Sequence, residues 1–158
     1  MIWRRWRNDC KQELRQMMLR TRLEKKIKKS IEETVSEYST CLPKIVEHFF
    51  YGAIEIAPQY LVIWYLFDRN SDLAEAQASG LCERIRRATV HHLKDHGYPV
   101  QAFEVPKPLS FRKITISGNQ KKAEELKAVL KNRKISVAFT SKEDIESKAH
   151  GDYRLYFQ

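Results

Sequence analysis

Apolar residues at the start of the chain recur at steps of three and four, the spacing that places them on one face of an α-helix. We expect one long helix from residue 4 to about residue 39, because this stretch contains no glycine or proline and Pro43 follows it. At 1.5 Å per residue such a helix would be about 50 Å long, longer than a small globular body is wide. Part of it should therefore project or pair with another chain. The apolar positions are Trp3, Trp6, Cys10, Leu14, Met17, Met18, Leu19, Leu23, Ile27, Ile31, Val35 and Tyr38.

After the proline the period changes to two, which is typical of strands. Residues 46–56 alternate between two faces, and residues 60–67 are apolar on both faces. The short Ala-Pro-Gln stretch between them suits a turn. The pattern predicts a β-hairpin whose second strand lies centrally in a sheet and is covered on both faces.

Helical spacing returns between residues 72 and 96. Asp72, followed three residues later by Glu75, predicts a capping box at the start of this helix, and Gly97 predicts its end. Gly80 is a weak point in the interior, so we expect the regular helix to begin in earnest after it.

The last third of the chain alternates between the two periods. The terminal Leu-Tyr-Phe-Gln resembles the remnant of a tag-removal site, but the alternation of Tyr153, Leu155 and Phe157 favours a native strand. The expected elements are strands at 109–117, 135–140 and 153–157, a helix after Gly118-Asn119, and a short helix from Ser141 to about Ala149.

These elements predict an α+β fold, a mixed sheet of about five strands with packed helices, preceded by the long amphipathic basic helix. We divide the chain into a helix at 1–42, serving as an arm or a docking helix, and an α+β domain at 43–158. With 158 residues, 42% of them apolar, the chain is large enough to bury a core and to fold as one domain plus an arm.

The net charge of +9 is confined to two blocks. Residues 1–29 hold eleven Lys and Arg against three acids, and residues 107–134 hold nine against two. A basic stripe on a helix attracts a polyanion or an anionic membrane surface, and Trp beside Arg suits an interfacial helix or base stacking. The expected contact residues, for a polyanion or another partner, are Trp3, Arg4, Arg5, Trp6, Arg7, Lys113, Lys121 and Lys122.

A more ordinary interpretation of the first block is a packing helix, whose apolar stripe docks on the sheet or dimerises while its basic side chains stay solvated. For the second block, Ser117-Gly118-Asn119 before a helix is a weak anion site. The phosphate-loop spacings GxxxxGK[ST] and GxGxxG are absent from the sequence. An exposed helix at a sheet edge is the simpler explanation of the second block.

Two histidines are the weak candidates for a metal site. His92 and His96 are four residues apart and share a helix face, a spacing that can hold a divalent cation. The sequence places no third ligand, and the helix dipole also favours histidine near a helix C-terminus. Cys82, near Arg84 and Arg86, is either a thiolate candidate or a buried small residue. We therefore predict no metal, no cofactor and no catalytic residue.

The three cysteines, Cys10, Cys41 and Cys82, are widely spaced and form no CxxC pair, which fits a reducing, cytoplasmic setting. No signal-peptide pattern follows the first residues, and the apolar run at 60–67 is far too short to span a bilayer. We expect a cytoplasmic protein with no transmembrane segment, and peripheral attachment to a membrane stays open.

Four stretches carry a resemblance to known sequences: Glu47–Ile56, Leu61–Phe67, Gly80 to Pro99, and Gly151-Asp152-Tyr153. Their pattern resembles small uncharacterised bacterial α+β domains and covers roughly residues 45–100 and 135–158. The resemblance implies no activity and carries over no functional residue. The basic block at 106–134 would be an elaboration of the pattern, and the N-terminal helix lies outside it.

Because no catalytic motif accompanies the charge, we interpret the chain as a non-enzymatic protein-interaction or regulatory protein that binds a protein partner, or itself. The long striped helix and the aromatic hairpin favour this interpretation. The alternative is polyanion binding, to nucleic acid first and to an anionic membrane next. A third class, an enzyme or metal site around His92 and His96 with Cys82 or Glu47, requires a pocket that unites them.

Overall fold

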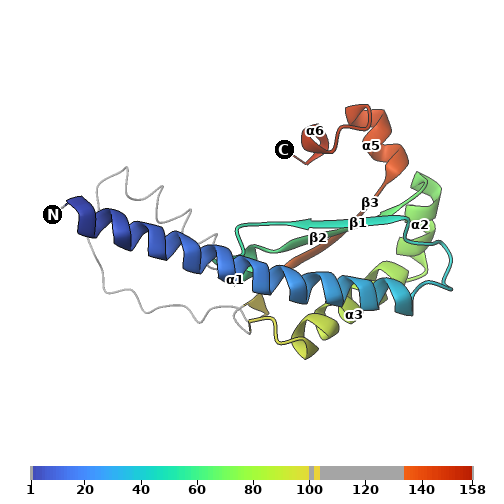
Figure 1. Cartoon of the computed structure of the whole chain (residues 1–158). Helices are drawn as coiled ribbons and strands as arrows, with labels where there is room; N and C mark the ends of the chain where they lie inside the picture. Colours follow the sequence, from blue (N-terminus) through green and yellow to red (C-terminus); the bar gives the residue numbers. More distant parts are fainter. Residues whose placement is uncertain (1, 100–101, 104–133, 158) are drawn as a thin grey trace, which may run out of the picture.

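The computed structural model describes residues 2–99, 102–103 and 134–157, with the backbone alone at residues 2–8 (Figure 1). The fold is α+β, as the sequence predicts. The strand expected at 109–117 and the helix expected after residue 119 lie outside the described residues. The elements are α1 (Ile2–Glu37), β1 (Glu47–Tyr51), the short 3₁₀ helix η1 (Pro58–Tyr60), β2 (Val62–Phe67), α2 (Asn70–Ala78), α3 (Leu81–Asp95), β3 (Ser136–Ser141), α5 (Lys142–Ala149) and α6 (Tyr153–Tyr156).

β2 is the central strand of a mixed sheet with the order β1-β2-β3. β1 runs antiparallel to β2, with Glu47 opposite Leu66 and Tyr51 opposite Val62. β3 runs parallel to β2 and begins beside Val62. The antiparallel pairing confirms the predicted hairpin, and the burial of five of the six β2 residues confirms the central position of its second strand. The first strand, expected over residues 46–56, ends at Tyr51, and η1 lies in the connection to β2.

The sheet has three strands within the described residues, so the expectation of about five was wrong there. Residues 153–157, expected as a strand, contain helix α6 instead. The Asp152 carboxylate caps this helix by accepting hydrogen bonds from the backbone N–H groups two and three positions on. The step of four from Tyr153 to Phe157 then places both rings against Phe49, with ring centroids 5.8 and 4.9 Å away. The Asp152 cap and the helical spacing of the two rings therefore favour a helix over the strand that the alternating pattern predicted.

The helix predicted from residue 72 is two helices, α2 and α3, separated at Gly80, which has a φ of 74°. α2 begins at Asn70, so the residue at the N-cap is Arg69 and not Asp72 as predicted. Asp72 is the third residue of the helix, and its carboxylate accepts a hydrogen bond from the N–H of Arg69 at 3.2 Å. Gly97, with a φ of 70°, follows the end of α3 as predicted. Glycine suits both positions because it has no Cβ to clash at positive φ.

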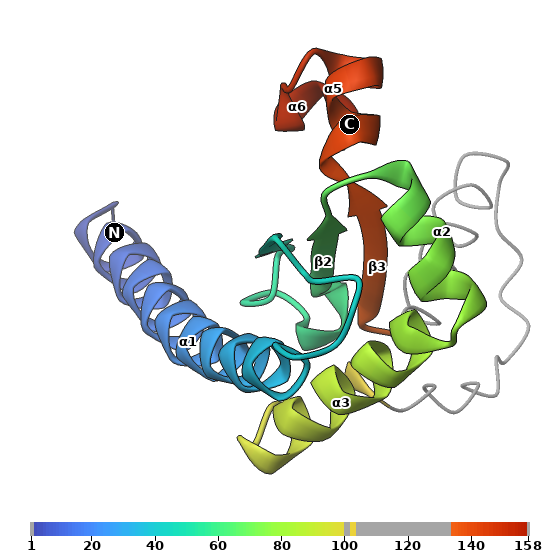
Figure 2. The ribbon, with the colours of Figure 1, turned by 90° about the vertical axis from the view of Figure 1, so that its right-hand side faces the viewer.

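α1 docks on the body with its C-terminal half and projects from the rest of the described residues with its N-terminal half (Figure 1, Figure 2). In the docked half, Leu23, Ile27 and Ile31 are almost completely buried. In the projecting half, Leu14 is 57% exposed and Met17 is 65% exposed. The predicted long helix is confirmed, and its two halves have different environments.

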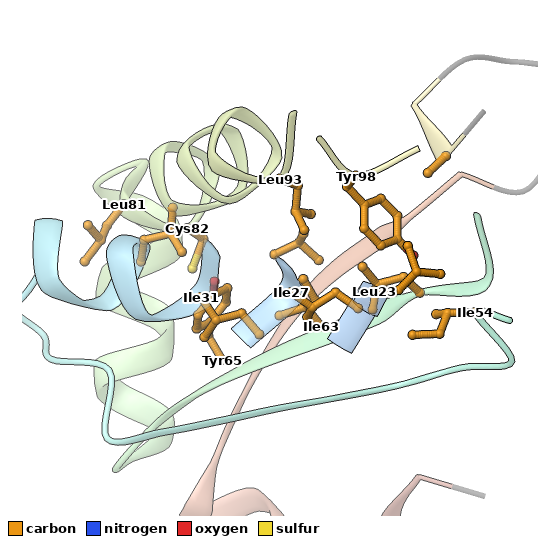
Figure 3. Close-up of a cluster of buried hydrophobic side chains, with 14 of the residues drawn as sticks. Leu23, Ile27, Ile31, Ile54, Ile63, Tyr65, Leu81, Cys82, Leu93 and Tyr98 are labelled. Atoms are coloured by element: carbon orange, nitrogen blue, oxygen red, sulfur yellow. The ribbon is translucent and has the colours of Figure 1, made fainter. Parts of the chain in front are cut away.

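The core lies between β2 and the two helices α1 and α3 (Figure 3). The three buried residues of α1 meet Ile63 and Tyr65 of β2 there. The Tyr65 hydroxyl is 2.8 Å from the Thr89 hydroxyl of α3, and burial raises the pKa of Tyr65 to about 12. On the opposite face of the sheet, Phe157 packs against Trp64 with ring centroids 4.8 Å apart.

Shortening a side chain should therefore lower the stability of the chain in the docked half of α1 and have little effect in the projecting half. Ile27→Ala is expected to lower the free energy of unfolding by about 2–5 kcal/mol, because it leaves a cavity against β2. Leu14→Ala, the matched control on the projecting half, should change it by less than about 0.5 kcal/mol. Urea denaturation followed by circular dichroism measures both, and equal losses would contradict the division of α1.

Candidate functional site

The projecting half of α1 exposes an apolar patch formed by Cys10, Leu14, Met17 and Met18. Steps of three and four place these residues along one side of the helix. Single exposed apolar residues are normal on protein surfaces, whereas a large contiguous group is typical of interaction surfaces. We refer to these four residues as the apolar patch.

The apolar patch does not continue the buried face of α1. At about 100° per residue, Met17 lies about 80° from Ile27 around the helix axis, and Leu14 lies about 140° from it. Leu23 and Ile31 lie on the same side of α1 as Ile27, and all three side chains are part of the core. The apolar positions that we interpreted as one stripe are therefore two stripes. The described part of the body buries one of them and leaves the other exposed.

Arg20 marks the point at which α1 leaves the body. Its guanidinium donates to Glu24 on the same helix at 2.9 Å and to Glu55, in the loop after β1, at 2.8 Å. On the docked side of this bridge Leu23 is 3% exposed, whereas Leu19 on the other side is 45% exposed. The bridge ties the helix to the loop between β1 and β2 just where the apolar contacts end.

Charged side chains border the apolar patch differently on its two sides. Helical spacing places Lys11, Arg15 and Arg22 along one side and Asp9 and Glu13 along the other. The three basic residues form no ion pair with any other described residue. The patch therefore has an acidic border and a basic border, and no described acidic residue pairs with the basic one.

Only part of the predicted contact set can be placed. Its first group lies in α1 N-terminal to the apolar patch, with side chains outside the described residues. Its second group lies wholly outside the described residues. The first group comprises Trp3, Arg4, Arg5, Trp6 and Arg7, and the second comprises Lys113, Lys121 and Lys122.

His92 and His96 occupy a face of α3 that meets α1. His92 lies 2.9 Å from Glu37 (Nε2 to Oε2) and 3.3 Å from Glu33 (Nδ1 to Oε2), and His96 lies 2.8 Å from Glu33. The hydrogen bond from His96 holds the pKa of Glu33 below its usual range. Sequence reasoning missed these partners, although Glu33 and Glu37 have the same four-residue spacing as the histidines. Within the described residues, no group of three or more His, Cys, Asp or Glu is arranged to hold a metal ion.

The remaining candidates for chemistry have other surroundings. Cys82 is buried, and burial raises the pKa of its thiol although Arg86 opposes the effect. Glu47 accepts a hydrogen bond from the Tyr153 hydroxyl at 2.6 Å and lies 3.6 Å from the Lys142 ammonium. No hydrogen bond or ion pair among the described residues links Cys82 or Glu47 to the two histidines, so these four residues do not form one site there.

The aromatic hairpin leaves a shallow groove of about 330 Å³ beside α6. Phe49 and Tyr51 line it from β1, and Tyr153 and Phe157 line it from the C-terminal segment. The Phe49 ring meets the Tyr153 and Phe157 rings edge-on, so part of its surface is already covered within the chain. The groove is therefore mainly the open side of a packed aromatic cluster.

Comparisons with known proteins supply no role for these surfaces. No protein-family model matches the chain, and no curated protein or solved structure matches it significantly. The resemblance to small bacterial domains accordingly stays a prediction. No helix in the described part of the chain is both long enough and apolar enough to cross a membrane.

Thiol labelling can check the exposure of the apolar patch. In a Cys41→Ser background, Cys10 should react with an aromatic disulfide reagent at the rate of a free thiol, because it is exposed. Cys82 should react only as the protein opens, because it is buried and its thiol pKa is raised. A fast reaction that survives Cys10→Ser would show that the assignment of the exposed thiol is wrong.

Proposed function

We propose that this chain is a non-enzymatic protein-interaction module, in which the α+β body holds the projecting half of α1 as a docking helix for a partner protein. The observation that carries the proposal is the apolar patch, exposed on a helix half that the body does not cover. A helix laid into a groove through side chains at steps of three and four is a common mode of recognition.

The size of the apolar patch limits what can bind it. Fully burying one Leu or Met side chain contributes roughly 1.5–3 kcal/mol, whereas association costs an estimated 4–15 kcal/mol. Three such side chains, Leu14, Met17 and Met18, therefore do not sustain a stable complex by themselves. The partner must also engage the charged borders of the patch or the residues N-terminal to it.

Charge favours a partner with acidic groups beside its apolar surface. Lys11, Arg15 and Arg22 place three cations along one border of the patch, and none of them pairs with an acidic residue in the described part of the chain. Residues 1–22 as a whole hold seven Lys and Arg against two acids, so pairing with a second copy through this segment would bring like charge together. We therefore propose an acidic amphipathic helix or groove, rather than a second copy, as the occupant.

Synthetic amphipathic helices of about 20 residues, with a Leu face bordered by Glu or by Lys, provide matched probes. The Glu-bordered probe should bind the full chain at least about tenfold more tightly than the Lys-bordered probe, as measured by fluorescence anisotropy. Leu14→Gln with Met17→Gln should weaken that binding at least about tenfold, because the apolar contact is lost.

The control for this test is Leu42→Gln with Ile56→Gln, two apolar residues that are 75% and 71% exposed outside α1. This pair should leave binding of the Glu-bordered probe unchanged within about twofold. Equal losses in the two double variants would contradict docking on the apolar patch. A salt-resistant dimer of the wild-type chain in sedimentation equilibrium would favour a second copy as the occupant instead.

Polyanion binding is the second candidate, favoured by the basic border of Lys11, Arg15 and Arg22, which has no ion pair with residues 9–99 or 134–157. Three phosphate contacts predict an affinity for duplex DNA that falls roughly 40-fold between 50 and 200 mM salt. Replacing all three residues by Gln should remove most of this salt dependence. Lys142→Gln, Lys148→Gln and Arg154→Gln together form a control with the same change in net charge.

Binding measured at several salt concentrations distinguishes nucleic acid from an anionic membrane as the ligand. Salt-independent binding, or no binding at low salt, would rule out nucleic acid at this border. Binding to vesicles of phosphatidylcholine and phosphatidylserine, without binding to DNA, would favour an anionic membrane. The same loss in both triple variants would mean that net charge, rather than this border, drives the binding.

A further inference from the structure

The apolar patch of α1 is rich in sulfur. Three of its four residues, Cys10, Met17 and Met18, carry a sulfur atom, and the two methionines are 65% and 52% exposed. The chain has three methionines, so two of them lie on this patch. Methionine is frequent at protein-binding surfaces because its side chain is flexible and polarisable. An oxidant in solution therefore has direct access to side chains through which the proposed partner would dock.

The two thioethers lie on either side of Leu14 around the helix. At about 100° per residue, Met17 lies about 60° from Leu14 toward the acidic border of the patch, and Met18 lies about 40° from it toward the basic border. Leu14 is itself 57% exposed. A partner surface wide enough to bury Leu14 therefore contacts a thioether on each side of it.

Neither thioether supports the fold of the described residues. The core cluster contains neither Met17 nor Met18. The hydrogen bond at Met17 involves its backbone carbonyl, which accepts from the Thr21 hydroxyl at 3.0 Å, and leaves the sulfur out. Adding an oxygen atom to either sulfur should therefore change the surface of α1 without disturbing the packing of the body.

We propose that Met17 and Met18 are sites of reversible oxidation by a peroxide, and that their conversion to sulfoxides releases an acidic amphipathic partner from the apolar patch. The inference rests on the proposed docking function and adds a means of regulating it.

The chemistry needs only hydrogen peroxide. The thioether sulfur gives an electron pair to one peroxide oxygen, the O–O bond breaks, and an S–O bond forms. The second oxygen leaves as water, so the sulfur is oxidised by two electrons and the peroxide is reduced. Methionine sulfoxide reductases reverse the step with a dithiol, which becomes a disulfide while the oxygen leaves as water.

The sulfoxide oxygen should weaken docking in two ways. Burying a polar oxygen without a hydrogen-bond donor is unfavourable, and the apolar contribution of the thioether is reduced. On the basic border, Arg15 and Arg22 lie three and four residues from Met18, so their guanidinium groups can reach an oxygen placed there. A guanidinium that donates to this oxygen is less available to the acidic groups of the partner.

Peroxide treatment of the full chain, with Cys10→Ser and Cys41→Ser to remove the more accessible thiols, tests the proposal. Peptide mass spectrometry should find an added oxygen on Met17 and on Met18 at about the rate of free methionine, because both are exposed. The affinity for the Glu-bordered probe, measured by fluorescence anisotropy, should then fall at least about tenfold. Both classes of methionine sulfoxide reductase, together with dithiothreitol, should restore the affinity.

Each variant is compared with itself before and after peroxide, so differences in starting affinity do not enter. Met17→Leu with Met18→Leu should limit the change to less than about twofold, because leucine has no sulfur to oxidise. The matched control adds Leu42→Met and Ile56→Met to this pair, which returns two thioethers at positions 75% and 71% exposed outside α1. Both new thioethers should be oxidised, and the affinity should again change by less than about twofold.

The failure of this inference is distinguishable from the failure of the docking function. Unchanged probe binding after complete oxidation of Met17 and Met18, or an equal loss in the control variant, would overturn the regulation and leave docking in place. Slow oxidation of the two residues, or a loss of helical circular dichroism on oxidation, would also overturn it. A probe that does not bind the untreated chain would instead contradict the docking function, and the regulation with it.

Discussion

The burial of the docked half of α1 is the contact on which the other features of this chain depend. β2 is apolar on both faces and occupies the centre of a small sheet, so it must be covered from two sides. Leu23, Ile27 and Ile31 of α1, together with α3, provide the cover on one side. The position of α1 then determines which part of the helix is left outside. Because the helix is much longer than the strands it covers, its first half extends past the part of the body that the structure describes (Figure 1).

Local patterns predicted the elements that local interactions determine. The hairpin, the break at Gly80, the end of α3 at Gly97 and the cap of α5 by Ser141 all rest on a few neighbouring residues, and all are present. The strand expected at 153–157 failed for a related reason. Its alternating pattern is also compatible with a helical step of four, and the nearby Asp152 cap decides between the two. The elements expected between residues 109 and 134 lie outside the described residues and stay predictions.

The site depended on tertiary information that spacing does not contain. The apolar positions of α1 were interpreted as a single stripe, although a step of about 100° per residue already separates Leu14 and Met17 from Ile27. Only the burial of Leu23 and Ile27 shows which of the two sides the body covers. The histidines on α3 were correctly placed on a common face. Their carboxylate partners were missed because nothing in the sequence states which helix packs against that face, although the four-residue spacing of Glu33 and Glu37 was visible.

The ion pairs from Arg20 to Glu24 and Glu55 hold α1 at the point from which its first half extends, so a tilt of the helix would pivot there. The 18 helical steps from Arg20 back to Ile2 form a stiff lever about 27 Å long. A tilt of only about 10° at the seat would sweep the far end through roughly 5 Å, which is close to one helical turn. A small repacking between α1 and α3, too slight to disturb the core, would thus be magnified into a displacement large enough to change what the tip can reach.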